Sequence, residues 1–166
     1  MRKEIFNKAE SILDHVMRRG SVICFVSLLL FVAAGVFVRF VPISSMGWAD
    51  EIIEFAFAWM VFLGAAVLWR GRSHFRVEIL PERLAGKKSG KVLEIFLSLC
   101  ALVFLLVFTY EGGLIALRAT DRSPILELPR TLWYMIIPIS GAIMTGYTIR
   151  DLITFFRGRS SKVQRH

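Results

Sequence analysis

Histidine and cysteine are scarce in this sequence, and their positions exclude several kinds of chemistry. The three histidines, His15, His74 and His166, all lie outside the long apolar runs. An intramembrane haem would therefore have no axial histidine, and a site of His/Cys type would have too few ligands for a metal. Cys24 and Cys100 belong to separate apolar runs and form no CxxC pair, which argues against thiol–disulfide exchange. We expect no metal site and no cofactor.

A catalytic nucleophile would also lack its general base. Ser27, Cys100 and Ser140 lie in apolar runs, and no histidine lies at their depth. We therefore expect no catalytic residue and no enzymatic activity, and a quinone-linked redox anchor is disfavoured on the same grounds. The sequence also shows no internal repeat, so the inverted-repeat architecture of self-sufficient secondary transporters gains no support.

Charge is nearly absent from four stretches, although 20% of all residues are charged. These stretches are residues 20–38, 55–69, 95–110 and 131–149. A hydrocarbon core of about 30 Å requires about 20 helical residues, and the two middle stretches reach that length only with flanking acids included. None of the four has the polar face of a soluble bundle helix. The pattern predicts an all-α membrane protein with four transmembrane helices, at residues 20–40, 50–69, 92–114 and 131–150.

Lys and Arg are distributed unevenly between the connections. Seventeen of the 21 lie in the N-terminal segment, the second connection and the C-terminal tail, and four lie in the first and third connections. Basic segments stay on the cytoplasmic side of a membrane. We expect a multi-pass protein of the bacterial cytoplasmic (inner) membrane with both termini and the loop at 70–91 inside. The net charge of +8 is then a topology signal, and we expect no nucleic-acid partner.

Two cytoplasmic segments carry apolar residues among basic ones. In residues 1–19 the apolar side chains recur at helical spacing, which predicts an amphipathic helix lying on the membrane surface; a plain extension of the first span is the alternative. We also expect an uncleaved N-terminus, because Arg39 follows the first apolar run and the leader contains acids. In the middle loop, Phe75 and Ile79 lie among basic residues and indicate an interfacial segment near lipid headgroups.

The remaining segments carry aromatic, proline and small-residue signals. Trp48 is typical of the aromatic belt at the membrane surface. The third connection, residues 115–130, is apolar for an outer loop, so it either contacts another protein or dips into the interface. Pro138 is expected near the middle of the fourth helix, where it removes one backbone hydrogen bond. Small residues in three spans, among them Gly64 and Gly141, indicate close helix contacts.

Three carboxylates in WADEIIEF, residues 48–55, lie where the second span begins. Asp50 is a good N-cap, acids in a first turn oppose the helix dipole, and Arg39 is the expected partner of Glu51 and Glu54. Glu54 lies four residues, about 6 Å, below the outer boundary and can reach water. Local structure is the first interpretation, a role between subunits the second, and direct ion or substrate binding the third.

The third span also has its acids near its ends when depth is counted at about 1.5 Å per residue. Glu94 and Glu111 fall at opposite ends of the third span, and no helix has an acid, base or histidine at its midplane. A proton- or ion-coupled exchanger needs such a group within reach of both sides. This argues against the chain working as a transporter alone.

The run WADEIIEFAFAWMVFLGAAVLWRGRSHFRVEIL resembles the signature region of a known family, the DctQ-like small membrane subunit of tripartite ATP-independent periplasmic (TRAP) transporters. LPRTLWYMIIPISGAIM resembles the fourth helix of that family, with an aromatic pair before a proline. The residues that carry the first resemblance are Trp48, Asp50, Glu51, Trp59, Gly64, Arg70 and His74.

The resemblance implies a division of labour among three proteins. A periplasmic substrate-binding protein captures an organic anion, a dicarboxylate, sugar acid or sulfonate, and a large membrane subunit carries it inward with sodium. The small subunit is a scaffold among membrane lipids, in which the signature residues, Glu54 and Pro138 are structural or face a subunit. Arg118 and Arg122 are candidate contacts for the binding protein. The alternative function is a small oligomeric ion-coupled transporter that uses Glu54.

Overall fold

The computed structural model describes residues 2–40, 47–70 and 88–156. These residues form the helices α1 (Arg2–Phe40), α2 (Gly47–Arg70), α4 (Lys88–Arg118), α5 (Thr131–Tyr134) and α6 (Ile136–Phe156). Among the described residues, four spans are long and apolar enough to cross a membrane: Glu10–Phe40, Gly47–Arg70, Ile95–Arg118 and Thr131–Thr154. The described part of the chain has no strand beyond one isolated bridge. The predicted all-α membrane class with four transmembrane helices is confirmed.

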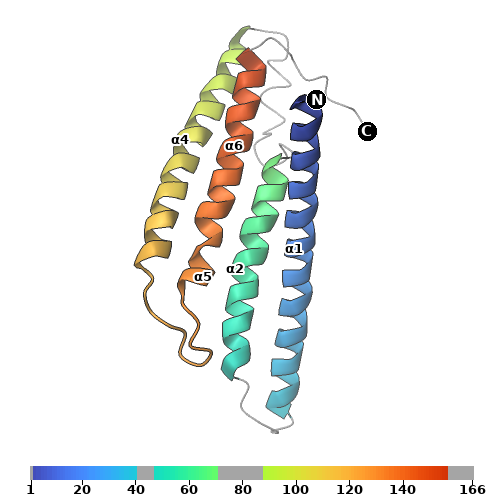
Figure 1. The fold of residues 1–166 in the computed structure, drawn as a ribbon, viewed down its shortest axis with the longest axis vertical. Helices are drawn as coiled ribbons and strands as arrows, with labels where there is room; N and C mark the ends of the chain where they lie inside the picture. Colours follow the sequence, from blue (N-terminus) through green and yellow to red (C-terminus); the bar gives the residue numbers. More distant parts are fainter. Residues whose placement is uncertain (1, 41–46, 71–87, 157–166) are drawn as a thin grey trace.

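The four long helices lie side by side in a single layer (Figure 1). Helix α1 packs on α2, α2 packs on α6, and α6 packs on α4, so α1 and α4 form the two edges of the layer. The start of α1 and the ends of α2 and α6 share one end, which we call the basic end. The opposite end, which carries residues 119–130, is called the loop end. Because the layer has two broad apolar faces, lipid or another protein must cover both.

A small core joins all four helices toward the basic end. Met17, Ala66, Leu105, Met144 and Tyr147 are buried there against one another. Each long helix contributes at least one of these side chains. Ala66 is fully buried, which shows how closely α2 approaches its neighbours at this level.

Glycines set the closest contacts between neighbouring helices. A Cβ on Gly112 would fall 2.5 Å from Cγ2 of Ile137, and a Cβ on Gly141 would collide with Oγ1 of Thr109. The α4–α6 contact therefore depends on two positions without side chains. Between α1 and α2, a Cβ on Gly20 would lie 3.2 Å from Leu63.

The N-terminal segment differs from the separate surface helix that its amphipathic pattern predicts. Helix α1 continues from Arg2 to Phe40 without a break, so the extension of the first span is the correct alternative. Gly20 is the weakest helix former at the junction, and a single glycine costs only about 1 kcal/mol. Its missing side chain is used in the contact with Leu63, so the helix gains packing at that position. The interfacial segment expected in the middle loop, including His74, lies outside the described residues.

Pro138 lies near the start of α6 and not in the middle of a helix. The break comes at Met135, between α5 and α6, one turn before the proline. This position fits the chemistry of proline, which cannot donate to the carbonyl four residues earlier and whose ring crowds that carbonyl, here Tyr134. Hydrogen bonds from Met135 N to Thr131 O and from Ile139 N to Met135 O, 2.9 and 3.2 Å long, keep the two pieces nearly continuous.

We predict that Gly141→Val destabilises the α4–α6 contact. Overpacking costs about 1–3 kcal/mol in unfolding free energy. The matched control is Gly146→Val on the same helix, because nothing lies within 4 Å of a Cβ there and the change in helix propensity is the same. Unfolding of the purified protein in mild detergent with added SDS measures both variants. Equal destabilisation by the two substitutions would contradict the close contact at Gly141.

Candidate functional site

The carboxylate of Glu51 binds the tip of the loop between α4 and α5. Glu51 lies in the second turn of α2 and is only 8% exposed. The backbone N–H of Ile125 donates to Oε1 at 2.9 Å, and that of Leu126 donates to Oε2 at 3.0 Å. Both carboxylate oxygens are thus used, and charge-assisted bonds of this kind are stronger than neutral ones.

The loop presents these amides because it folds back on itself. Ser123 N donates to Leu128 O at 2.8 Å, and Arg130 N donates to Asp121 O at 3.0 Å. Glu127 has a φ of 53°, the left-handed conformation that allows so tight a reversal. The amides at the tip point toward α2, where Glu51 accepts from them.

Aromatic side chains fasten α5 to α2 beside this carboxylate. Trp133 is buried, and its Nε1 donates to the backbone oxygen of Glu51 at 3.3 Å. The ring of Phe55 meets that of Trp133 edge to face, with centroids 5.4 Å apart. Trp59 Nε1 donates to Leu132 O at 3.2 Å. The α4–α5 loop and α5 therefore form one unit with the first half of α2, which we call the loop-end cluster.

The other acids of WADEIIEF have different surroundings. Glu54 pairs with Arg130 at 3.7 Å and is exposed. Asp50 lies in the first turn of α2, which begins at Gly47, so it adds charge at the helix start but is not the N-cap. The predicted pairing of Glu51 and Glu54 with Arg39 is wrong. The carboxylates contact residues that follow in the sequence by more than 70 positions, and Arg39 is exposed at the end of α1.

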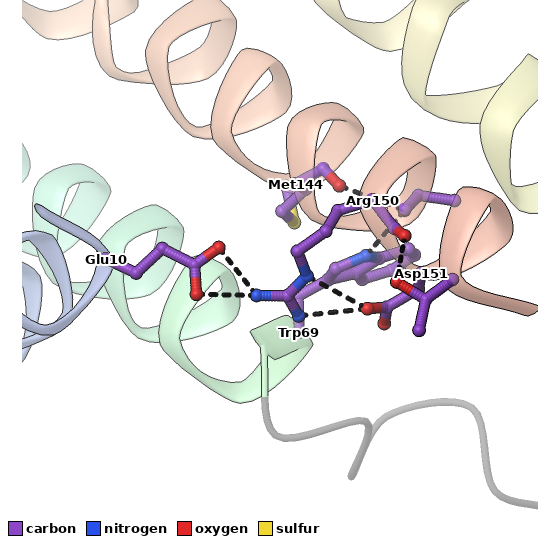
Figure 2. A network of polar contacts seen from close by, with 7 residues as sticks. Glu10, Trp69, Met144, Arg150 and Asp151 are labelled. Atoms are coloured by element: carbon purple, nitrogen blue, oxygen red, sulfur yellow. Dashed lines mark hydrogen bonds and ion pairs between the residues drawn. The ribbon is translucent and has the colours of Figure 1, made fainter. Parts of the chain in front are cut away.

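A second polar cluster lies at the basic end and joins α1, α2 and α6 (Figure 2). Arg150 Nη1 donates to both oxygens of Glu10 at 2.7 Å, and its Nη2 contacts Asp151 at 2.9 Å. The same guanidinium lies 5.3 Å from the centroid of the Tyr147 ring. Because Glu10 comes from α1 and Arg150 from α6, this pair fixes the two helices on either side of α2.

Two further contacts at the basic end involve the last residues of α2. Asp14 pairs with Arg70 at 3.0 Å, and Trp69 Nε1 donates to Thr148 Oγ1 at 2.9 Å. The sequence reasoning missed Glu10, Asp14 and Arg150. A usable signal exists, because Glu10, Asp14 and Met17 recur at helical spacing on one face of α1, and Met17 is buried.

The remaining predicted site residues have structural surroundings where the structure describes them. Trp48 packs edge to face on Phe31, with centroids 5.8 Å apart. Gly64 lies beside Ser21, which donates to Met60 O at 3.2 Å. Within residues 2–40, 47–70 and 88–156, no group of three or more His, Cys, Asp or Glu side chains could hold a metal ion. The polar side chains at the two ends of the layer hold helices to one another and hold the α4–α5 loop to α2.

Glu111 departs from its predicted place at the end of the third span. Helix α4 continues past Gly112 and Gly113 to Arg118, so seven residues separate Glu111 from the end of the helix. The physical reason is that Gly112 serves helix packing against Ile137 and does not end the helix. At 1.5 Å per residue, Glu111 lies about 10 Å inside α4.

Comparison with known proteins finds one family and several relatives of the same kind. The family described as the DctQ component of the tripartite ATP-independent periplasmic transporters matches residues 28–158. The chain is 27% identical over 144 residues to a Haemophilus influenzae protein described as a TRAP transporter small permease protein, covering 83% of this chain and 87% of that protein.

Two further relatives are named with a transported anion. The chain is 31% identical over 99 residues, 58% of its length, to the C4-dicarboxylate TRAP transporter small permease protein DctQ of Rhodobacter capsulatus. It is 29% identical over 108 residues, 63% of its length, to the isethionate TRAP transporter permease protein DctMQ of Oleidesulfovibrio alaskensis. The matched stretch spans 44% of the Rhodobacter protein and 17% of the Oleidesulfovibrio protein.

We predict that Glu51→Ala releases the tip of the α4–α5 loop. Loss of two charge-assisted bonds should speed amide hydrogen exchange of Ile125 and Leu126 by about tenfold or more. The control is Asp50→Ala, which removes a neighbouring carboxylate that is exposed. Hydrogen exchange of the purified protein, read by mass spectrometry over residues 119–130, distinguishes them. Unchanged exchange in Glu51→Ala would show that the carboxylate does not hold the loop.

Proposed function

We infer the function of this chain from its family: it belongs to the DctQ component of the tripartite ATP-independent periplasmic transporters. It is therefore a permease subunit of a transporter and not an enzyme. We propose that it is the small accessory subunit, which packs against the large membrane subunit and supports uptake of an organic anion. In this proposal a periplasmic binding protein delivers the anion, and a sodium gradient drives its entry.

The observation that carries this proposal is the use of polar side chains inside the layer. Glu10, Asp14 and Glu51 each bind a cation or backbone amides of this same chain. Carboxylates occupied in this way hold helices together and are not free to take up and release an ion. Glu54 is exposed beside Arg130, close to the loop end, so nothing in its position favours the alternative of a self-contained transporter with Glu54 as its coupling group.

The relatives support the partner and the substrate class of this proposal. In the Oleidesulfovibrio protein the matched stretch makes up 17% of a permease chain, so a DctQ-like part there shares one polypeptide with a much larger part. The names of two relatives carry C4-dicarboxylate and isethionate. Both are organic anions, and dicarboxylates, sugar acids and sulfonates are the substrates we propose.

The charge pattern supports an orientation for the layer. Helix α1 begins at the basic end, and α2 and α6 end there, so the Lys- and Arg-rich segments 1–19, 70–91 and 150–166 all adjoin it in the sequence. We therefore propose that the basic end faces the cytoplasm with both termini. The loop end then faces the periplasm, where the binding protein approaches. Arg118 and Arg122 are both exposed at that end and are the proposed contacts for an acidic surface of the binding protein.

The proposal predicts that the chain is required for uptake but does not perform it. Deleting it from cells that carry the complete transporter should abolish sodium-driven uptake of the anion. Tagged chain should co-purify with the large subunit, and the chain alone in liposomes should show no uptake. Ion-coupled uptake by the isolated chain would contradict the accessory role.

The docking part of the proposal is tested in the same uptake assay. Arg118→Glu combined with Arg122→Glu should raise the concentration of binding protein needed for half-maximal uptake, with the membrane complex intact. Arg39→Glu is the matched control, because Arg39 is exposed at the end of α1, on the same end of the layer. An unchanged requirement in the double variant would remove the α4–α5 loop as a docking contact.

A further inference from the structure

Glu111 lies on an exposed face of α4, the helix at one edge of the layer. It is exposed, and so are Phe104, Val107 and Ile115, which share its face at spacings of three and four residues. Helix α4 packs on α6 and α5 on its other side, and no helix of the described chain covers this face. The stripe formed by Phe104, Val107, Glu111 and Ile115 is therefore apolar except for a single carboxylate.

The depth of Glu111 follows from the helix register. It lies seven positions before Arg118, the nearest end of α4, which corresponds to about 10 Å along the helix. Its neighbour Gly112 lies against Ile137 and Pro138, at the start of α6. A glutamate side chain is too short to reach the end of that helix, unlike the long side chains of Lys and Arg. Glu111 thus lies within the apolar span Ile95–Arg118 and not at its end.

Glu111 has no partner within the described residues. No hydrogen bond or ion pair joins it to another residue of ranges 2–40, 47–70 and 88–156, including Arg118 two turns away. By contrast, Glu10, Asp14 and Glu51 each have partners from this chain. An ionisable side chain in a membrane faces protein or a water-filled cavity, because lipid tails offer it neither a counter-charge nor a hydrogen bond.

We propose that the stripe around Glu111 is the contact surface for a transmembrane helix of the large permease subunit. That helix presents a cation or a hydrogen-bond donor, from Lys, Arg, His or an amide, at the depth of Glu111. Phe104, Val107 and Ile115 supply the apolar contact on both sides of the polar pair. This inference rests on the proposed function, which supplies the large subunit, and it assigns the interface to α4.

Photo-crosslinking locates the surface. The photoreactive residue p-benzoylphenylalanine, placed at position 107 or 115 of the full chain in the assembled complex, should crosslink to the large subunit. Position 108 is the control on the same helix, because Phe108 faces inward against Phe62 and should give no such crosslink. Crosslinks to lipid alone from positions 107 and 115 would overturn the inference.

Substitution of Glu111 tests the role of the carboxylate. Glu111→Leu should reduce the large subunit recovered with the tagged chain by about tenfold, the effect of losing a hydrogen bond to a charged group. Glu111→Gln keeps an acceptor and should retain most of it. Glu127→Leu is the control for the same change at an exposed loop site. Undiminished recovery with Glu111→Leu would contradict a polar partner for this carboxylate on the large subunit.

These experiments distinguish a wrong assignment of α4 from a wrong function of the chain. If unaltered chain recovers the large subunit while positions 107 and 115 and Glu111→Leu give the contrary results, the assignment of α4 is wrong and the proposed function stands. If unaltered chain recovers no large subunit, the proposed function and this inference both fail.

Discussion

The bond between the Glu51 carboxylate and the amides of Ile125 and Leu126 connects segments 74 and 75 residues apart in sequence. A backbone amide that packs against another element needs an acceptor, because an unpaired one costs about as much as a lost hydrogen bond. Glu51 supplies that acceptor. The loop then places Arg130 beside Glu54 and leads into α5, where Trp133 closes over the backbone of Glu51. The loop end of the layer depends on this one side chain.

At the basic end, ion pairs between side chains hold the helices together. There, ion pairs join α1 to α6 through Glu10 and Arg150 and join α1 to α2 through Asp14 and Arg70. Between the two ends, glycines and alanines let the helices approach closely, and a shared core near Ala66 includes all four. A layer fixed at both ends and closely packed between them is suited to hold a neighbouring membrane protein, and less suited to the rearrangements of an alternating-access transporter.

The sequence alone was sufficient to predict the four spans, because the length and purity of an apolar run depend on local composition. It also indicated the packing role of Gly64 and Gly141. The partners of Glu51 could not be predicted, since they are backbone amides of a distant loop whose fold depends on tertiary contacts. Arg39 is near the carboxylates in sequence, but nearness in sequence is a weak guide to nearness in space.

Three other differences between prediction and structure arise where a residue does not do what its type usually does. The amphipathic pattern of the N-terminal segment is compatible both with a surface helix and with a continuation of α1. Tertiary contacts of Glu10, Asp14 and Met17 hold the continuous helix against the layer. The break at Met135 precedes Pro138 by one turn, because proline disturbs the carbonyl before it. Helix α4 passes through Gly112 and Gly113 and ends at Arg118, so Glu111 lies seven positions before the end of the helix.

The central claim is that the carboxylates of α2 are structural and that the transport chemistry belongs to the partner subunit. The most direct measurement is sodium-dependent uptake per assembled complex in proteoliposomes that contain the complete transporter with Glu54→Gln. The account predicts the same initial rate and the same sodium dependence as the unaltered complex. Loss of uptake, or a shifted sodium dependence, with the amount of complex unchanged would contradict it.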